Sequence, residues 1–385
     1  MIPYGRQKID QEDIDAVVET LKSSFLTQGP KVPDFEKAIC NYTGSQFSLA
    51  FNSATSALHS ACLALDLAEG DILWTSPISF VASANCGLYC RAKLDFVDID
   101  PSTNNMCPNA LEKKLIESKE KGTLPKVVIP VHLSGMPCDM KKISSLAKKY
   151  NFKIIEDASH AIGSEYEGSK TGNCIYSDIC IFSFHPVKII TTGEGGVALT
   201  NCNRLYNKLS LIRSHGITRD EKLMSIPPDG PWYYEQQILG YNYRMTDIQA
   251  SLGISQLSKI NEFILRRREI EETYNQELSS LPILLPEKSN NAKSSLHLYI
   301  IKLRLEIAKI THKEFFDKLI SKGIGVNLHY IPIYRQPYFK KLGFIKEQYT
   351  NSELYYSRAM SIPIHPSMSN KDQKTVIKAI KQTLA

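Results

Sequence analysis

Four short segments carry the residue types of a site for a phosphorylated, planar cofactor. Lys188 follows an apolar run, in a turn where an amine with a lowered pKa could act as a nucleophile. Asp157 closes another apolar run, and a carboxylate buried there needs a cationic partner. Phe80 could stack on a ring, and Ala54 and Thr55 open a helix whose free N–H groups could bind phosphate. Each segment alone also fits an ordinary role as a surface lysine, a core aromatic or a helix cap.

Together the four segments meet the requirements of pyridoxal 5′-phosphate (PLP). A lysine can bind this cofactor covalently, and a carboxylate can keep its pyridine nitrogen protonated, so that the ring works as an electron sink. The sequence therefore predicts a PLP enzyme in which Lys188 and Asp157 are the two central residues. No His/Cys pattern completes a metal site, and we expect no metal.

The order of predicted elements places these segments at one edge of a sheet. Short apolar runs alternate with helical patterns up to residue 200, which predicts an α/β fold with a mostly parallel sheet flanked by helices. Ligands of such sheets bind beyond the carboxyl ends of the strands, where the four segments lie. The predicted strands cover residues 48–52, 71–75, 94–98, 126–132, 153–156, 179–184 and 197–200.

The pattern changes after about residue 250. One long helix is predicted over residues 248–268, with the run Arg266-Arg267-Arg268 on a solvated face. We therefore expect a large PLP-binding domain with N-terminal helices over residues 1–250 and a small α+β domain over residues 251–385. The further predictions for the small domain are strands over 296–303 and 326–330 and helices over 311–322 and 370–384.

The composition is that of an ordinary globular protein. Of 385 residues, 43% are hydrophobic and 22% are charged, which excludes a disordered chain. No apolar run is long enough for a membrane span and no signal peptide is recognisable, so we expect a cytoplasmic protein with no membrane partner and reduced cysteines. The net charge of +6 is too dilute to indicate nucleic acid binding.

One glycine motif invites a different interpretation. Gly193-Glu194-Gly195-Gly196-Val197-Ala198 fits G-x-G-x-x-A, but a dinucleotide site needs a strand before this motif and a helix after it. A strand is predicted after it here, so a nicotinamide-dependent oxidoreductase is disfavoured.

The motifs around these residues resemble the DegT/DnrJ/EryC1/StrS family of sugar aminotransferases. The resemblance implies an aspartate aminotransferase-like, fold type I, PLP-dependent homodimer with active sites shared between subunits. Sugar dehydratases of this family carry histidine where Lys188 stands, so the lysine favours transamination. The motifs, in family order, are Glu156-Asp157-Ala158-Ser159-His160, Ser183-Phe184-His185-Pro186-Val187-Lys188, Thr192-Gly193-Glu194-Gly195-Gly196 and Gly240-Tyr241-Asn242-Tyr243-Arg244-Met245.

The resemblance also implies a role for each matching residue. Lys188 would carry the cofactor and move protons, Asp157 would pair with the pyridine nitrogen, and His160 would lie beside the ring or its phenolic oxygen. Phe80 would stack on the ring. The phosphate would be held by Ala54, Thr55 and Ser183, and by Asn242 from the other subunit. The nucleotide-sugar site would be lined by Tyr4, Thr27, Asn327, His329 and Tyr330.

Three segments resemble one subgroup of the family, which acts in pseudaminic acid biosynthesis: residues 53–55, 76–80 and 329–332. This likeness implies that UDP-2-acetamido-2,6-dideoxy-β-L-arabino-hex-4-ulose is aminated at C4 with glutamate as donor. The same chemistry on a UDP-bacillosamine or legionaminic acid precursor, or on a dTDP-keto sugar, is the nearest alternative. A catalytically silent regulator on this fold is the alternative of another class, but too few residues precede the sheet for a DNA-binding domain.

Overall fold

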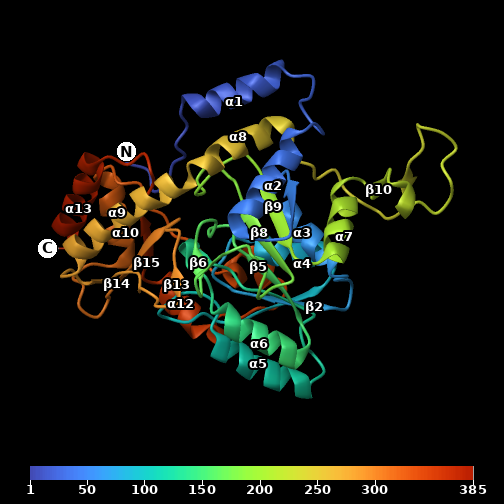
Figure 1. The fold of residues 1–385 in the computed structure, drawn as a ribbon. Coiled ribbons are helices and arrows are strands. Elements are labelled where there is room, and N and C mark those ends of the chain that lie inside the picture. Colours follow the sequence, from blue (N-terminus) through green and yellow to red (C-terminus); the bar gives the residue numbers. More distant parts are fainter. Residues whose placement is uncertain (385) are drawn as a thin grey trace.

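The computed structural model describes residues 1–384, and its centre is a seven-stranded sheet between layers of helices (Figure 1). The strand order is β1-β9-β8-β5-β4-β2-β3. Only β9 runs against its neighbours, which confirms the mostly parallel sheet. The strands are β1 (Phe47–Phe51), β2 (Ile72–Thr75), β3 (Lys93–Phe96), β4 (Val127–Ile129), β5 (Lys153–Asp157), β8 (Ile179–Ser183) and β9 (Gly196–Thr200).

Helices bury both faces of this sheet, which explains why its strands read as continuous apolar runs. One face packs against α3 (Ala54–Ala64), α4 (Ala82–Tyr89) and α7 (Asn203–Arg213). The opposite face packs against α2 (Lys31–Thr43), α5 (Pro108–Glu120), α6 (Met140–Tyr150) and α8 (Asp247–Ser258). A strand, not a helix, follows the glycine motif at Gly196, as the sequence predicts.

The single helix predicted over residues 248–268 is wrong. The structure divides this stretch at Lys259 into α8 and α9 (Ile260–Leu278). The Lys259 ammonium forms ion pairs with Asp10 and Asp13 at the start of α1 (Gln11–Lys22). The N-terminal helix is thereby tied to the junction, and α1 packs along α8 (Figure 1).

The predicted solvated face of the arginine run is also wrong, because the Arg267 side chain is fully buried. Its guanidinium donates hydrogen bonds to the carbonyl oxygens of Leu296, His297 and Ile364. Burial lowers the pKa of Arg267 to about 9. The helical spacing from Phe263 to Arg267 already placed it on the inner face of α9, since residues four apart share a face.

The C-terminal part builds its own core around an antiparallel sheet with the order β12-β14-β15. The strand predicted over residues 326–330 is wrong, because only Asn327 pairs, in an isolated bridge with Ser361. The division at residue 250 stays a prediction, since α9 joins the large core through Phe263 and the C-terminal core from Ile270 onward. The elements are β12 (Ile283–Leu284), β14 (Tyr299–Leu303), β15 (Ala359–Ile362), α10 (His312–Ser321), α12 (Thr350–Tyr356) and α13 (Asn370–Leu384).

Short elements connect these parts, and the arm with β10 and β11 projects from the body of the molecule (Figure 1). Among the helices of residues 1–384, none has the length and apolar character of a membrane span. The short elements are β6 (Glu165–Tyr166), β7 (Ser169–Lys170), β10 (Ile217–Thr218), β11 (Glu235–Gln236), β13 (Ala292–Lys293), α11 (Pro337–Lys340), η1 (Leu133–Gly135), η2 (Glu221–Leu223), η3 (Ile333–Arg335) and η4 (Lys346–Gln348).

Candidate active site

A cavity of about 450 Å³ lies where the carboxyl ends of β5 and β8 meet the N-terminus of α3. It collects predicted site residues from both parts of the chain. The predicted residues that line it are Tyr4, Ala54, Thr55, Phe80, Asp157, His160, Ser183, Lys188, Asn327, His329 and Tyr330.

Lys188 enters the cavity from the turn between β8 and β9, and its backbone N–H donates to the His185 carbonyl (2.9 Å). Within residues 1–384 its amine makes no hydrogen bond, and Asp157 is the charged group that acts on it. Burial lowers the pKa of Lys188 to about 8, although the Asp157 carboxylate acts in the opposite direction. A large share of this amine is therefore neutral near pH 8 and able to attack a carbonyl group.

We expect Lys188 to react selectively with an acylating reagent in the cofactor-free protein. With a pKa of about 8, half of this amine is neutral at pH 8. An ordinary lysine has a pKa of ~10.4 and is neutral about 100-fold less often at that pH. Competitive labelling from pH 6 to 10, read by peptide mass spectrometry, should give a midpoint near 8 for Lys188. The exposed Lys313 serves as control, and a Lys188 midpoint equal to that of Lys313 would contradict the assignment.

Asp157 is buried at the end of β5, and neutral hydroxyl groups hold its carboxylate. The Ser83 hydroxyl donates to Oδ2 (2.6 Å), and the Ser159 hydroxyl donates to Oδ1 (2.6 Å). These donors fix the direction of the carboxylate without cancelling its charge. The charge is thus available to a cation in the cavity, such as a protonated ring nitrogen. Sequence reasoning missed Ser83, because it reaches Asp157 from α4.

His160 is a neutral histidine with a fixed tautomer. Its Nδ1 accepts a hydrogen bond from the backbone N–H of Ser134 (3.3 Å), which leaves the ring proton on Nε2, facing the Tyr330 hydroxyl (3.0 Å). Burial, assisted by the charge of Lys188 and by His329, lowers the pKa of His160 well below its ordinary value. His160 can therefore donate a hydrogen bond toward the cavity region without adding positive charge.

The first turn of α3 forms an anion cradle beside Ser183. Ser53 caps the helix by accepting from the N–H of Ser56, and the N–H groups of Ala54 and Thr55 have no partner within the helix. A Cβ atom at position 196 would lie 2.4 Å from the nitrogen of Ala54, so only glycine lets β9 approach this turn. Free N–H groups at the positive end of a helix suit a phosphate.

The loop from Asn327 to Tyr330 forms another part of the cavity wall. The His329 ring is held by the Ser361 hydroxyl (2.8 Å) and packs 4.9 Å from the Tyr4 ring. Burial, followed by the charge of Lys188, lowers the pKa of His329 to about 3, so this ring is neutral. The Phe80 side chain is 58% exposed and its ring lies 6.2 Å from the Tyr330 ring, so it has accessible surface for contact with a planar ligand.

His297 is a cavity residue that sequence reasoning missed. Only 3% of it is exposed, its ring lies 4.3 Å from the His160 ring, and its Nδ1 has no hydrogen-bond partner within the described chain. Burial, followed by His160 and Lys188, lowers its pKa well below the ordinary value. It enters from the segment before β14, where the strand-end argument gives no signal.

Two predicted residues lie outside the cavity. Thr27 forms an isolated bridge with Thr246, and the Asn242 carbonyl accepts a hydrogen bond from the Asn52 side chain (3.4 Å). Both are exposed. This chain alone therefore does not bring Thr27 and Asn242 to the other site residues.

The family follows from comparison with known proteins. Residues 7–381 match the model of the DegT/DnrJ/EryC1/StrS aminotransferase family. The chain therefore belongs to this family of sugar aminotransferases, and the α/β fold described above is the fold of its structural relatives.

Three relatives illustrate the likeness. The chain is 42% identical over 378 residues to the UDP-4-amino-4,6-dideoxy-N-acetyl-β-L-altrosamine transaminase of Campylobacter jejuni, covering 98% of this chain and 96% of that protein. It superposes on Helicobacter pylori PseC, an aminotransferase involved in the biosynthesis of pseudoaminic acid, with a TM-score of 0.90, 31% identity and coverage of 100% and 99%. The PLP form of the sugar aminotransferase Spr1654 from Streptococcus pneumoniae gives a TM-score of 0.88, 28% identity and coverage of 99% and 98%.

Proposed function

We propose that this aminotransferase uses PLP and glutamate to convert UDP-2-acetamido-2,6-dideoxy-β-L-arabino-hex-4-ulose into its 4-amino sugar. The observation that carries the proposal is the shared cavity, in which the unpaired Lys188 amine, the Asp157 carboxylate and the α3 cradle meet. The named Campylobacter relative supports the choice of sugar.

The cavity fits PLP in three respects. The α3 cradle, with Ser183, would hold the phosphate, and Asp157 would hold the protonated ring nitrogen. Phe80 would cover one face of the ring. When bound, the cofactor supplies an electron sink for the bonds to the reacting carbon.

In the proposed reaction, a side chain of the protein carries the protons. Lys188 Nζ would be the base that takes the proton from Cα of the amino donor in the first half-reaction. In the second half-reaction its acid form would give a proton to C4 of the acceptor sugar. A base with a pKa of about 8 serves in both directions near neutral pH. His160 and His329 are held neutral by burial and would not compete with Lys188 for these protons.

The acceptor preference tests the proposed sugar. We expect catalytic efficiency at least ~10-fold higher for the L-arabino 4-keto sugar than for its D-xylo epimer, because a site that hydrogen-bonds its substrate rejects an analogue with misplaced groups. Initial rates with purified enzyme, PLP and glutamate should be compared for both epimers. A matched dTDP-4-keto sugar should be poorer than either. Faster turnover of the D-xylo epimer or the dTDP sugar would assign the protein to the alternative branch described above.

We further propose a homodimer with shared active sites. The described cavity lining contains one lysine and no arginine, so the anionic groups of the substrates need donors from elsewhere. Large exposed apolar side chains provide surface for a partner, and they gather on α1, the segment after it and the projecting arm. They include Ile14, Val18, Leu21, Phe25, Leu26, Trp232 and Leu239.

Subunit mixing tests whether Asn242 acts from the partner. A Lys188→Ala chain and an Asn242→Ala chain are each impaired alone. A heterodimer contains one site with both residues intact, provided that Asn242 reaches across a two-fold interface. Random 1:1 mixing should then restore about a quarter of the wild-type turnover, because half of the dimers have one working site. No rescue, with heterodimers shown by native mass spectrometry, would place Asn242 within its own site.

A cytoplasmic location is part of the proposal. All nine cysteines are free, as expected for a protein of a reducing compartment.

A further inference from the structure

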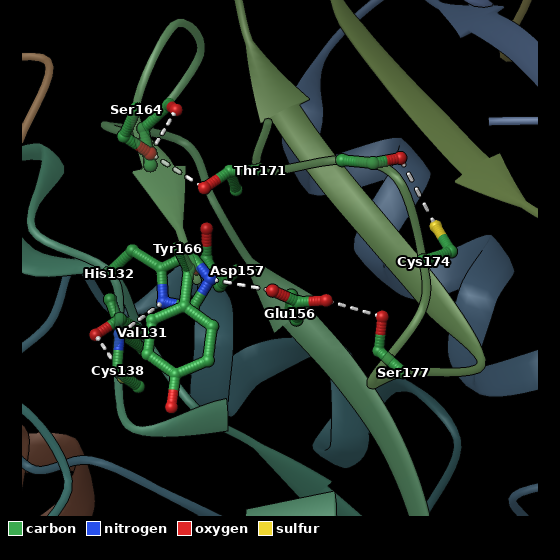
Figure 2. A network of polar contacts seen from close by, with 12 residues as sticks. Val131, His132, Cys138, Glu156, Asp157, Ser164, Tyr166, Thr171, Cys174 and Ser177 are labelled. Atoms are coloured by element: carbon green, nitrogen blue, oxygen red, sulfur yellow. Dashed lines mark hydrogen bonds and ion pairs between the residues drawn. The ribbon is translucent and has the colours of Figure 1, made fainter. Parts of the chain in front are cut away.

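Behind Asp157, on the other face of β5, lies a buried hydrogen-bonded group formed by Glu156, His132 and Ser177 (Figure 2). His132 Nε2 lies 2.8 Å from Glu156 Oε2, and the Ser177 hydroxyl donates to Glu156 Oε1 (2.5 Å). The exposed fraction is 6% for Glu156 and 0% for His132. These side chains are outside the cavity lining, so they have no direct part in the chemistry proposed above.

The contacts of His132 fix its tautomer, and both oxygens of the Glu156 carboxylate have a hydrogen-bond partner. The backbone N–H of Cys138 donates to His132 Nδ1 (3.1 Å), so the ring proton is on Nε2 and points to Glu156. Figure 2 shows these bonds running from the loop at Cys138 through His132 and Glu156 to Ser177. Glu156, the residue before Asp157, is thus hydrogen-bonded to the segments on both sides of β5: His132 follows β4, and Ser177 precedes β8.

His132 also holds the backbone of Asp157. The regular pairing of β4 with β5 ends at Val128 and Ile154, three residues before Asp157. Beyond that point, the N–H of His132 donates to the Asp157 carbonyl (3.0 Å), and the N–H of Asp157 donates to the Pro130 carbonyl (2.9 Å). His132 therefore contacts the strand end twice, through its backbone on Asp157 and through its ring on Glu156.

Stability alone does not account for a buried carboxylate. Removing such a charge from water costs several kcal/mol, and apolar side chains of similar volume often serve a fold as well. Glu156 and Asp157 are neighbours on β5, so their side chains point to opposite faces of the sheet. The Glu156–His132 contact therefore holds the same strand end that carries the Asp157 carboxylate on the cavity side.

We propose that Glu156 and His132 are a positioning pair that holds the end of β5, so that the Asp157 carboxylate, aligned by Ser83 and Ser159, faces a ring nitrogen in the cavity. The inference rests on the proposed PLP function. It predicts that a change on the far face of β5 alters the protonation behaviour and affinity of the bound cofactor, and not only the stability of the protein.

The test compares Glu156→Gln and His132→Asn with a matched control, Thr171→Val. Thr171 forms a buried hydrogen bond of 2.7 Å with Ser164 in the same region, shown in Figure 2, but none with β5. The holoenzymes are titrated from pH 5 to 10 by cofactor absorbance, the PLP dissociation constant is measured, and thermal melting reports stability. We expect both pair variants to move the absorbance midpoint by at least about half a pH unit and to weaken PLP binding about fivefold.

Thr171→Val should lower the melting temperature without either effect. The proposal is overturned if both pair variants keep the wild-type midpoint and affinity, or if Thr171→Val changes them equally. If Glu156→Gln or His132→Asn does not fold, Ser177→Ala takes its place, because it removes one hydrogen bond to Glu156. Its absorbance midpoint and PLP affinity are then judged by the same criteria. Failure of the wild-type protein to bind PLP would instead refute the proposed function.

Discussion

Replacing Lys188 by alanine is expected to lower kcat at least ~10³-fold, because in the proposed function one amine serves both as cofactor attachment point and as proton carrier. The other basic side chains of the described cavity lining are histidines: burial keeps His160, His297 and His329 neutral, and the fourth, His185, is exposed. Single-turnover and steady-state rates with glutamate should both fall.

The same variant has a chemical test that does not depend on turnover. Borohydride reduction of the wild-type holoenzyme should leave the cofactor covalently attached to the peptide that contains Lys188, as read by mass spectrometry. Lys153→Ala is a suitable control, because Lys153 pairs with Asp178 on the surface, away from the cavity. Borohydride-fixed cofactor in the Lys188→Ala protein would show that another residue binds it.

Replacing Asp157 by asparagine is expected to slow turnover by about 10- to 100-fold. A hydrogen bond to a charged group is worth ~1.5–3 kcal/mol, which corresponds to that range of rates. Asparagine keeps the size of the side chain and can still accept from Ser83 or Ser159, so the loss reports the missing negative charge. Wild-type kcat in Asp157→Asn, with the cofactor bound, would remove Asp157 from the mechanism.

Ser83→Ala separates charge from direction at the same carboxylate. This variant keeps the charge of Asp157 and removes one bond to Oδ2, so its effect should be smaller than that of Asp157→Asn. An equal loss would indicate that alignment of the carboxylate, rather than its charge, limits the rate.

Much of the fold and cavity was predictable because the signals are local. Each strand of the parallel sheet is buried on both faces and reads as a short apolar run, and strand ends in such sheets meet at one edge. Asp157 and Lys188 both follow such runs, and the structure brings them together as expected. The capping segment at Ser53 likewise marked the start of α3.

The missed features depend on long-range packing. His297 reaches the cavity from the C-terminal part of the chain, and Ser83 touches Asp157 across 74 positions in sequence. The division of α8 from α9 depends on the Lys259 ion pairs with α1, which helical periodicity does not report. Arg267 was misread because charge was given more weight than its position among apolar residues of α9.

Transfer of nitrogen to the sugar is the most direct test of the central proposal. The purified enzyme, with PLP, would be incubated with ¹⁵N-glutamate and UDP-2-acetamido-2,6-dideoxy-β-L-arabino-hex-4-ulose, and the product examined by mass spectrometry and NMR. We predict one ¹⁵N atom in the sugar, bonded to C4, with one 2-oxoglutarate formed per amino sugar. A product labelled at C3, or no labelled sugar from an enzyme shown to hold PLP, would contradict the proposal.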